Sequence, residues 1–225
     1  MNIAVIPARG GSKRIPKKNI KDFLGKPIIA YSIEAAIKSK LFDAVIVSTD
    51  DKEIAVVAKS YGASVPFLRP ENLSDDFTGT TPVVQHAVNW YSEHLTKPEN
   101  VCCIYATAPL IQSQYIRDGF EKLNNIEQGL VYSVATFAFP IQRAQRMDKL
   151  GNLSAFYPEF MPCRSQDLEE AYHDAGQFYW WTEKSLTQSV NEVRGIILPR
   201  YLVQDIDTLE DWKNAELMYQ VLRQQ

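Results

Sequence analysis

Cysteine is scarce in this chain of 225 residues, and its three residues follow no pairing pattern. Cys102 and Cys103 are adjacent in an apolar run, and Cys163 stands alone. An odd number without framework spacing excludes a disulfide-stapled miniprotein and predicts reduced thiols in a cytoplasmic protein. Adjacent side chains in a strand point to opposite faces, so Cys102 and Cys103 are expected to be small buried hydrophobes.

Long apolar runs and an excess of either charge are also missing. The uninterrupted apolar stretches are only a few residues long, so no membrane-spanning helix is predicted. The first residues, MNIAVIPARGG, have no basic region and no cleavage pattern, so they are expected to form a strand and not a signal peptide. Lys plus Arg number 24 and Asp plus Glu 27, and a net charge of −3 argues against a dedicated nucleic-acid binder.

Short apolar, β-branched runs alternate with helical patterns along most of the chain. Strands are expected at 2–7, 43–48, 63–67, 100–105, 130–136, 176–181 and 195–198. Helices are expected to begin near Pro27, Asp50, Thr81, Ser113 and Thr208. This alternation predicts one α/β domain over 1–225, with a doubly wound, mostly parallel sheet covered on both faces.

The pattern breaks at 139–174, which is long for a loop and has no clean period. Such a segment is expected to be functional or to form an interface. Its apolar side chains, Phe156, Tyr157, Phe160 and Met161, would be exposed in an isolated chain. We therefore interpret 139–174 as a small dimerisation insertion that packs in a two-fold homodimer.

The segment 8–26 concentrates positive charge directly after the first predicted strand. It holds seven cations and one anion, together with the glycine pair Gly10-Gly11. A solvated basic loop is one interpretation; a loop that binds a polyanion through backbone N–H groups is the sharper one. The segment is not a Walker A motif, because Gly25-Lys26 is followed by Pro27, and it does not match G-x-G-x-x-G.

Residues 6–19, IPARGGSKRIPKKN, resemble the signature of the CMP-sugar synthetases, cytidylyltransferases that activate nine-carbon ulosonic acids. The family pattern is roughly A-R-x-x-S-K-x-x-x-x-K-N after the first strand, and six positions match it: Ala8, Arg9, Ser12, Lys13, Lys18 and Asn19. The resemblance extends over essentially the whole chain, including Leu68-Arg69-Pro70 and the segment 107–110. It implies a Rossmann-like nucleotidyltransferase fold, CTP as substrate, Mg²⁺, release of pyrophosphate and, usually, a dimer.

The resemblance also implies roles at matching positions. Arg9 and Lys18 would be catalytic and hold the triphosphate, which suits a transition state that gains negative charge on phosphate. Arg offers a planar fork and Lys a point charge, so the two are not interchangeable. The remaining nucleotide-binding candidates are Ala8, Gly10, Gly11, Ser12, Lys13, Asn19, Arg69 and Thr80, which stands where the family often has Ser.

Asp205 and Asp207 form an Asp-x-Asp motif shortly before the last predicted helix. In an extended segment, side chains at i and i+2 face the same way. Mg²⁺ is commonly held by one or two carboxylates with substrate phosphates and water, so the pair is a candidate metal site. The alternative is that both acids only favour the N-terminus of the following helix.

At the positions that the resemblance assigns to sugar binding, the sequence differs from the sialic-acid enzymes. Tyr105 stands where those enzymes tend to place Gln, and the segment 174–179, DAGQFY, replaces their Asn-Gly-Ala-Ile-Tyr run. With 139–143 and 164–168, these departures resemble the pseudaminic acid cytidylyltransferases. The substrate-binding candidates are Tyr105, Arg143, Arg164, His173, Gln177 and Tyr179. Arg143 and Arg164 are expected to act across a dimer interface on the sugar carboxylate.

The expected reaction is therefore transfer of CMP from CTP to the anomeric hydroxyl of a nine-carbon ulosonic acid, with pseudaminic acid as the expected sugar. A synthetase for N-acetylneuraminic acid or a related ulosonate is one alternative. A metal-dependent glycosyltransferase also uses Asp-x-Asp, but its motif usually follows an early or middle strand, whereas this one lies about twenty residues from the C-terminus. A nucleotide-binding regulator would not need the basic loop and the acid pair together.

Overall fold

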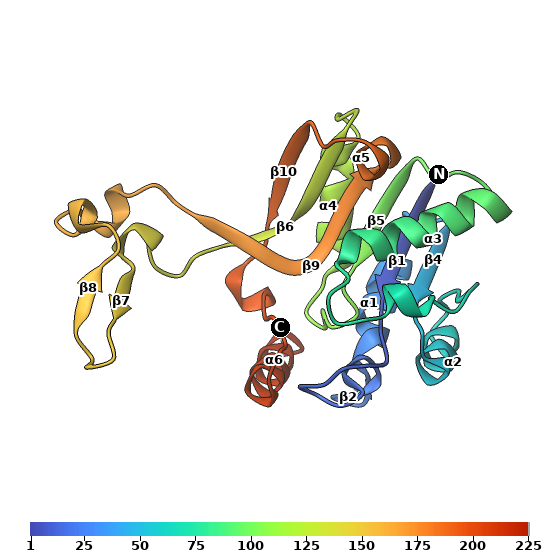
Figure 1. Cartoon of the computed structure of the whole chain (residues 1–225), viewed down its shortest axis with the longest axis horizontal. Helices are drawn as coiled ribbons and strands as arrows, with labels where there is room; N and C mark the ends of the chain where they lie inside the picture. Colours follow the sequence, from blue (N-terminus) through green and yellow to red (C-terminus); the bar gives the residue numbers. More distant parts are fainter. Residues whose placement is uncertain (225) are drawn as a thin grey trace.

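A computed structural model describes residues 1–224, and its centre is a six-stranded sheet in the order β10-β6-β9-β5-β1-β4 (Figure 1). The strands are β1 (Asn2–Pro7), β4 (Ala44–Ser48), β5 (Asn100–Ile104), β6 (Gly129–Thr136), β9 (Tyr172–Thr182) and β10 (Glu192–Ile197). β1 runs parallel to β4 and β5, and β10 runs parallel to β6. β9 is antiparallel to both β5 and β6 and joins the two parallel groups. The predicted mostly parallel sheet is confirmed.

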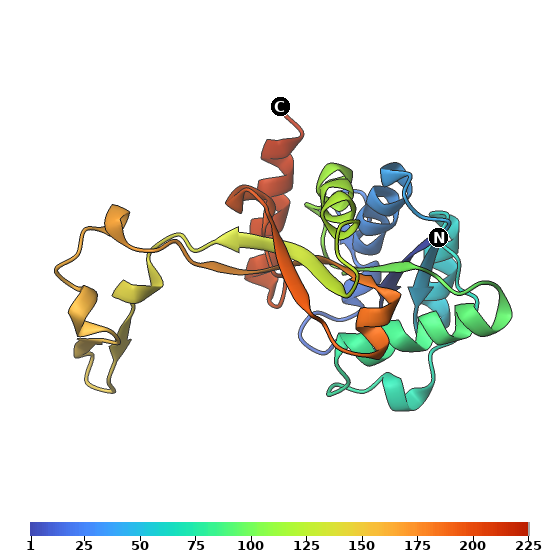
Figure 2. The same ribbon diagram turned by 90° about the horizontal axis from the view of Figure 1, so that it is seen from above.

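Helices cover both faces of the sheet. They are α1 (Ile28–Ser39), α2 (Lys52–Ser60), α3 (Thr80–His94), α4 (Ser113–Leu123), the short α5 (Glu183–Thr187) and α6 (Leu209–Leu222). Apolar residues of α1, α2 and α4 share one core cluster, and residues of α3 share the other (Figure 2). Cys102 lies in the first cluster and Cys103 in the second, both fully buried, which confirms their predicted opposite orientation. In the described residues no helix is long and apolar enough to cross a membrane.

A third cluster, rich in aromatic residues, packs α6 against the end of the basic segment 8–26. Phe23 lies in the short hairpin β2 (Asp22–Phe23) and β3 (Lys26–Pro27), and its ring centroid is 5.3 Å from that of Tyr31 and 5.5 Å from that of Trp212 in α6. Thr208 caps α6 with a capping box to Asp211, as its position predicted. The packing therefore brings the end of the chain to a loop near its start.

Residues 137–171, between β6 and β9, form an arm that projects from the globular body (Figures 1 and 2). The arm contains the hairpin β7 (Gln145–Met147) and β8 (Leu153–Ala155) and three single-turn 3₁₀ helices, η3 (Ile141–Arg143), η4 (Pro158–Phe160) and η5 (Ser165–Asp167). Further 3₁₀ turns in the body are η1 (Lys18–Ile20), η2 (Glu71–Leu73) and η6 (Arg200–Leu202). The predicted insertion at 139–174 overlaps this arm, although its last residues already belong to β9.

Two local predictions are wrong. The expected strand at 63–67 is a single bridge between Ile46 and Ser64, and Pro66 has no N–H with which to extend a ladder. Asp51, and not Asp50, is the N-cap of α2, since its carboxylate accepts the N–H groups of Glu53 and Ile54. Asp50 is turned toward the first loop instead.

Candidate active site

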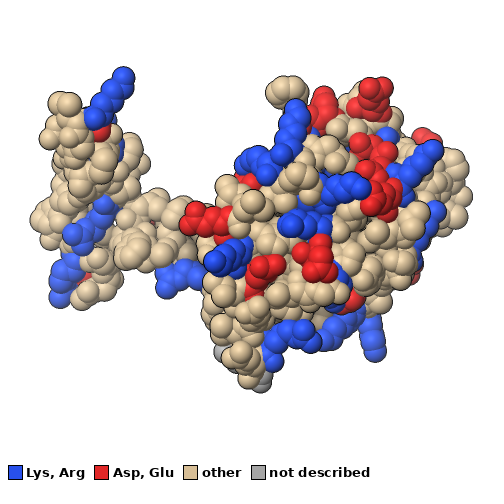
Figure 3. Space-filling view, turned by 90° about the horizontal axis from the view of Figure 1, so that it is seen from below, with Lys and Arg blue, Asp and Glu red and all other residues tan. Residues whose placement is uncertain are grey.

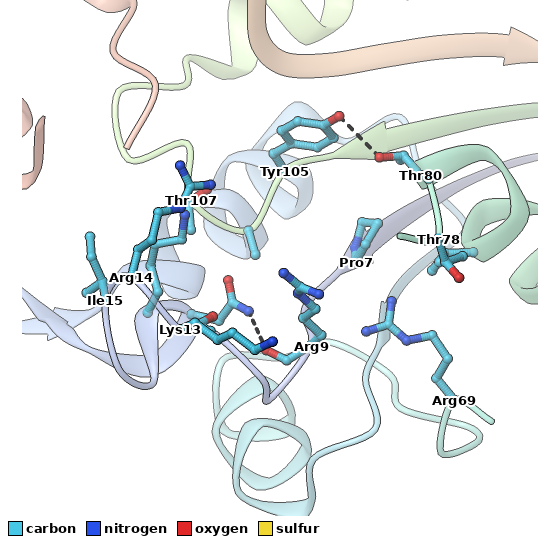
Figure 4. A pocket seen from close by; sticks show the side chains of 16 residues that line it. Pro7, Arg9, Lys13, Arg14, Ile15, Arg69, Thr78, Thr80, Tyr105 and Thr107 are labelled. Atoms are coloured by element: carbon cyan, nitrogen blue, oxygen red, sulfur yellow. Dashed lines mark hydrogen bonds between the residues drawn. The ribbon is translucent and has the colours of Figure 1, made fainter. Parts of the chain in front are cut away.

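A cleft of about 240 Å³ opens at the carboxyl end of β1 (Figure 4). Its walls come from the loop after β1, from the start of α3 and from the residues that follow β5. Doubly wound sheets bind ligands at this edge, outside the carboxyl ends of their strands. Figure 4 shows Arg9 between Lys13 and Arg69, with Thr80 and Tyr105 along another side of the cleft.

The loop after β1 is held in place by backbone contacts. Ala8 donates its N–H to Ser48 O at 2.9 Å, and Gly10 donates to Asp50 Oδ1 at 2.9 Å. A Cβ on Gly10 would lie 2.7 Å from Asp51 Oδ2, so only glycine fits this close approach. The buried Asn19 donates its side-chain amide to Arg9 O at 2.9 Å and closes the loop. Ala8, Gly10 and Asn19 thus shape the loop, whereas Gly11 has open space beside it.

Two cations of the loop meet an acidic turn that precedes α3. Arg9 Nη1 lies 2.6 Å from Asp76 Oδ1 and donates to the Asp75 carbonyl at 2.7 Å. Lys13 Nζ pairs with the other oxygen of Asp76. The hydrogen bond from Lys13, with the nearby charge of Arg9, lowers the pKa of Asp76, so this carboxyl is ionised at neutral pH.

Two further cations of the loop meet the Asp-x-Asp motif. Lys18 Nζ donates to Ile206 O at 2.6 Å and lies 3.6 Å from Asp207 Oδ1. Arg14 Nη1 lies 2.7 Å from Asp207 Oδ2. Ile206 is fully buried, whereas Asp205 is exposed and Asp207 partly exposed. This alternation fits the predicted placement of both acids on the same side of an extended segment.

Arg69 forms the deepest cationic part of the cleft. Its side chain is only 4% exposed, and Nη2 lies 3.6 Å from Asp50 Oδ1. Burial lowers the pKa of Arg69, and the charge of Asp50 partly opposes that shift. Nε and Nη2 have no hydrogen-bond partner in the described residues. The backbone N–H of Arg69 donates to Thr49 O at 2.7 Å, which fixes the residue to the end of β4.

Two tyrosine side chains, Tyr105 and Tyr179 of β9, lie on the side of the cleft that faces β9. The hydroxyls of Thr80 and Tyr105 are 3.2 Å apart, and the ring centroids of Tyr105 and Tyr179 are 5.2 Å apart. Tyr179 donates its hydroxyl to Asp174 Oδ2 at 2.7 Å, and burial, together with this bond, raises the pKa of Tyr179. Tyr105 therefore faces the cleft, and Tyr179 supports it from behind.

The other sugar-site candidates lie away from this cleft. Gln177 is buried and donates its amide to Leu202 O at 2.5 Å, and the ring of His173 packs against Phe137. Arg143 donates to Ser165 Oγ at 3.1 Å, and Arg164 pairs with Asp167 at 2.7 Å, all within the arm. Of the substrate-binding candidates, only Tyr105 lines the cleft in one chain, and Tyr179 packs behind it. Among the nucleotide candidates, Ser12 also lines the cleft.

Four charged residues at the site were not among the predicted residues: Arg14, Asp50, Asp75 and Asp76. Asp50 lies two residues beyond the end of β4, and that position at the carboxyl edge of the sheet was an available signal. No group of three His, Cys, Asp or Glu within residues 1–224 is arranged to hold a metal ion by itself. On the face in Figure 3, acidic and basic side chains are interspersed over the body and do not form one field of a single sign.

Comparisons with known proteins point to one enzyme family. A family model described as cytidylyltransferase matches residues 3–157. The chain is 45% identical to a pseudaminic acid cytidylyltransferase of Campylobacter jejuni, covering 98% of this chain and 97% of the relative. It is 33% identical to a CMP-N,N'-diacetyllegionaminic acid synthase of Legionella pneumophila, over 97% and 96% of the two chains.

A solved structure shows the same fold. It is that of a CMP:2-keto-3-deoxy-manno-octonic acid synthetase in complex with CTP, with a TM-score of 0.71 and 16% identity over 97% of this chain and 98% of that chain. At this low identity the likeness concerns the fold alone.

Proposed function

The chain belongs to the cytidylyltransferase family, and from that premise we propose that it transfers CMP from CTP to the anomeric hydroxyl of pseudaminic acid and releases pyrophosphate. The family resemblance inferred from residues 6–19 is confirmed by the match over residues 3–157. The observation that carries the proposal is the cationic cleft, in which Arg9, Lys13 and Lys18 line a site at the end of β1. The chain's relatives support the choice of sugar.

In this reaction the loop cations act on the triphosphate. The attack on the α-phosphate places negative charge on its oxygens and on the leaving pyrophosphate. Arg9 reaches the middle of the cleft from the end of β1, and Lys18 is fixed beside Asp207 by its bond to Ile206 O. Because both cations are held before the substrate arrives, they stabilise that charge with little rearrangement.

The donor chemistry of Asp205 and Asp207 fits Mg²⁺, which prefers hard oxygen ligands. Two carboxylates without a third protein ligand suit a site that is completed by phosphate oxygens and water. Asp207 already faces Lys18 and Arg14, so its position is set relative to the proposed phosphate cations. Mg²⁺ held there would neutralise phosphate charge during the transfer.

The sugar half of the site needs a second chain under this proposal. In one chain, the arm arginines pair within the arm and do not line the cleft. The arm also exposes apolar side chains, among them Phe139 at 82% and Phe156 at 51%. We propose a two-fold homodimer in which the partner's arm brings arginine to the sugar carboxylate.

The three cysteines are free, which agrees with our proposal that the reaction takes place in the cytoplasm. No nucleic-acid partner is proposed, since the net charge is −3 and charges of both signs are interspersed on the face shown in Figure 3. The runner-up function is synthesis of CMP-N-acetylneuraminate or another CMP-ulosonate, which the Legionella relative favours. The alternative of an Asp-x-Asp glycosyltransferase loses its support, because the chain matches a cytidylyltransferase model over residues 3–157.

A pyrophosphate-release assay tests the proposal. Release should require CTP, pseudaminic acid and Mg²⁺ together, and replacing CTP by UTP should reduce it strongly. A glycosyltransferase would instead consume a CMP-sugar and release no pyrophosphate from CTP. No pyrophosphate with any nine-carbon ulosonic acid would contradict the proposal.

A further inference from the structure

Arg9 and Lys13, two cations of the proposed phosphate site, already share an anion in the structure. Asp76 places Oδ1 2.6 Å from Arg9 Nη1, and its other oxygen pairs with Lys13 Nζ. One carboxylate thus presents one oxygen to each cation, as two oxygens of a phosphate group would. Without this anion, the two positive side chains would face each other unneutralised.

The turn that carries Asp76 is folded to keep it there. The Asp75 side chain accepts the N–H groups of Phe77 at 2.9 Å and Thr78 at 2.6 Å. The Asp75 carbonyl accepts a further bond from Arg9 at 2.7 Å. The turn is therefore closed by its own side chain and attached to Arg9 at two points.

The same turn narrows the cleft. Thr78, Gly79 and Thr80, which begin two residues after Asp76, line the wall. The volume of about 240 Å³ is below the roughly 300–1,000 Å³ typical of small-molecule sites. The Asp76 contacts therefore hold this wall close to the loop cations, and their loss would leave the wall free to move outward.

We propose that Asp76 is a resident counter-anion of the nucleotide site, which the phosphates of CTP or pyrophosphate displace from Arg9 and Lys13. The inference rests on the proposed function and assigns a further residue to the same site. Because a carboxylate competes with phosphate for the same cations, Asp76 lowers the affinity for polyphosphate. The competition favours release of pyrophosphate after the transfer and keeps both cations positioned in the empty enzyme.

Titration calorimetry with inorganic pyrophosphate, in the absence of sugar, tests the inference. Asp76→Asn keeps the size of the side chain and removes its charge, so it should bind pyrophosphate about three- to tenfold more tightly than the wild-type chain, the range expected for relief of two exposed ion pairs. Glu71→Gln, in the neighbouring η2, makes the same change of charge. Glu71 forms no ion pair in the described residues, so this control should bind as the wild type does.

Unchanged or weaker binding by Asp76→Asn would overturn the inference, as would equal tightening by Glu71→Gln, since that would reveal a general charge effect. Asp76→Ala provides a second variant without a side-chain amide, and it should tighten binding in the same direction. If the wild-type chain binds no pyrophosphate, the proposed function fails together with this inference. If the wild type binds and only the tightening is missing, the inference alone fails.

Discussion

In the cleft, charged side chains find partners in distant parts of the sequence, whereas in the arm the arginines Arg143 and Arg164 find partners within the arm itself. Arg9 meets Asp76 across 67 positions, and Lys18 meets Ile206 across 188. Arg164 pairs with Asp167 only three positions away. The fold of one chain therefore assembles the proposed nucleotide half of the site, while the arginines of the arm contact only other residues of the arm.

Burial also distinguishes the globular body from the arm. Phe178 and Trp180 in β9 are fully buried against α4, and a Cβ on Gly119 would approach Phe178 to 2.9 Å. In the arm, Phe139, Leu153 and Phe156 are each more than half exposed. Several exposed apolar side chains on one projecting segment are typical of an interaction site, so we expect the arm to pack against another surface.

The largest effect should come from the core. Phe178→Ala removes a fully buried ring, so we expect the free energy of unfolding to fall by about 3–5 kcal/mol in urea titrations. Phe156→Ala in the arm should change the stability of the globular body by less than about 1 kcal/mol. Similar losses at both positions would show that arm and body unfold as one unit.

The second largest effect should come from Asp207 of the Asp-x-Asp motif. Asp207→Ala removes a proposed Mg²⁺ ligand and the partner of Lys18 and Arg14, and kcat/KM should fall at least about 100-fold. Its melting temperature should change little, because Asp207 is partly exposed. Glu210→Gln, three residues away and exposed, is the matched control. Near-normal turnover of Asp207→Ala in Mg²⁺ would show that the metal assignment is wrong.

The loop cations should follow with losses of about 100-fold each for Arg9→Ala and Lys18→Ala, measured as kcat/KM. Lys21→Ala is the control from the same loop, since Lys21 lies over the Trp212 ring at 5.3 Å and not in the cleft. Equal losses at Lys18 and Lys21 would indicate a diffuse basic patch instead of a specific site.

A smaller signal tests whether the arm of one chain serves the cleft of another. Lys18→Ala and Arg143→Ala should each be impaired alone. When the two are co-expressed in equal amounts, about half of the dimers are mixed and one of their two sites is intact, so about a quarter of wild-type activity should return. Activity no higher than the mean of the two variants would show that each chain completes its own site.

The sequence indicated the loop that lines the cleft because its signal is contiguous: six matching positions fall between Ala8 and Asn19 on one loop. It did not reveal Asp50, Asp75 or Asp76 as partners, since an acid that serves a distant cation looks the same in sequence as a solvated one. The direction of β9 was also not predicted, because alternation along a strand is the same in parallel and antiparallel pairs. The arm sequence has neither a helical nor a strand periodicity. Its length and its aromatic residues therefore predicted an interface but not its hairpin or its 3₁₀ turns.

The most direct measurement is the ratio of kcat/KM for pseudaminic acid and N-acetylneuraminic acid with CTP and Mg²⁺. Tyr105 presents an aromatic ring beside the cleft, with the ring of Tyr179 behind it, and its hydroxyl already contacts that of Thr80, so we expect extra sugar hydroxyls to lack partners there. We predict a preference for pseudaminic acid of at least about 100-fold, the factor expected from two such mismatches. Comparable values for the two sugars would contradict the assignment of pseudaminic acid as the substrate.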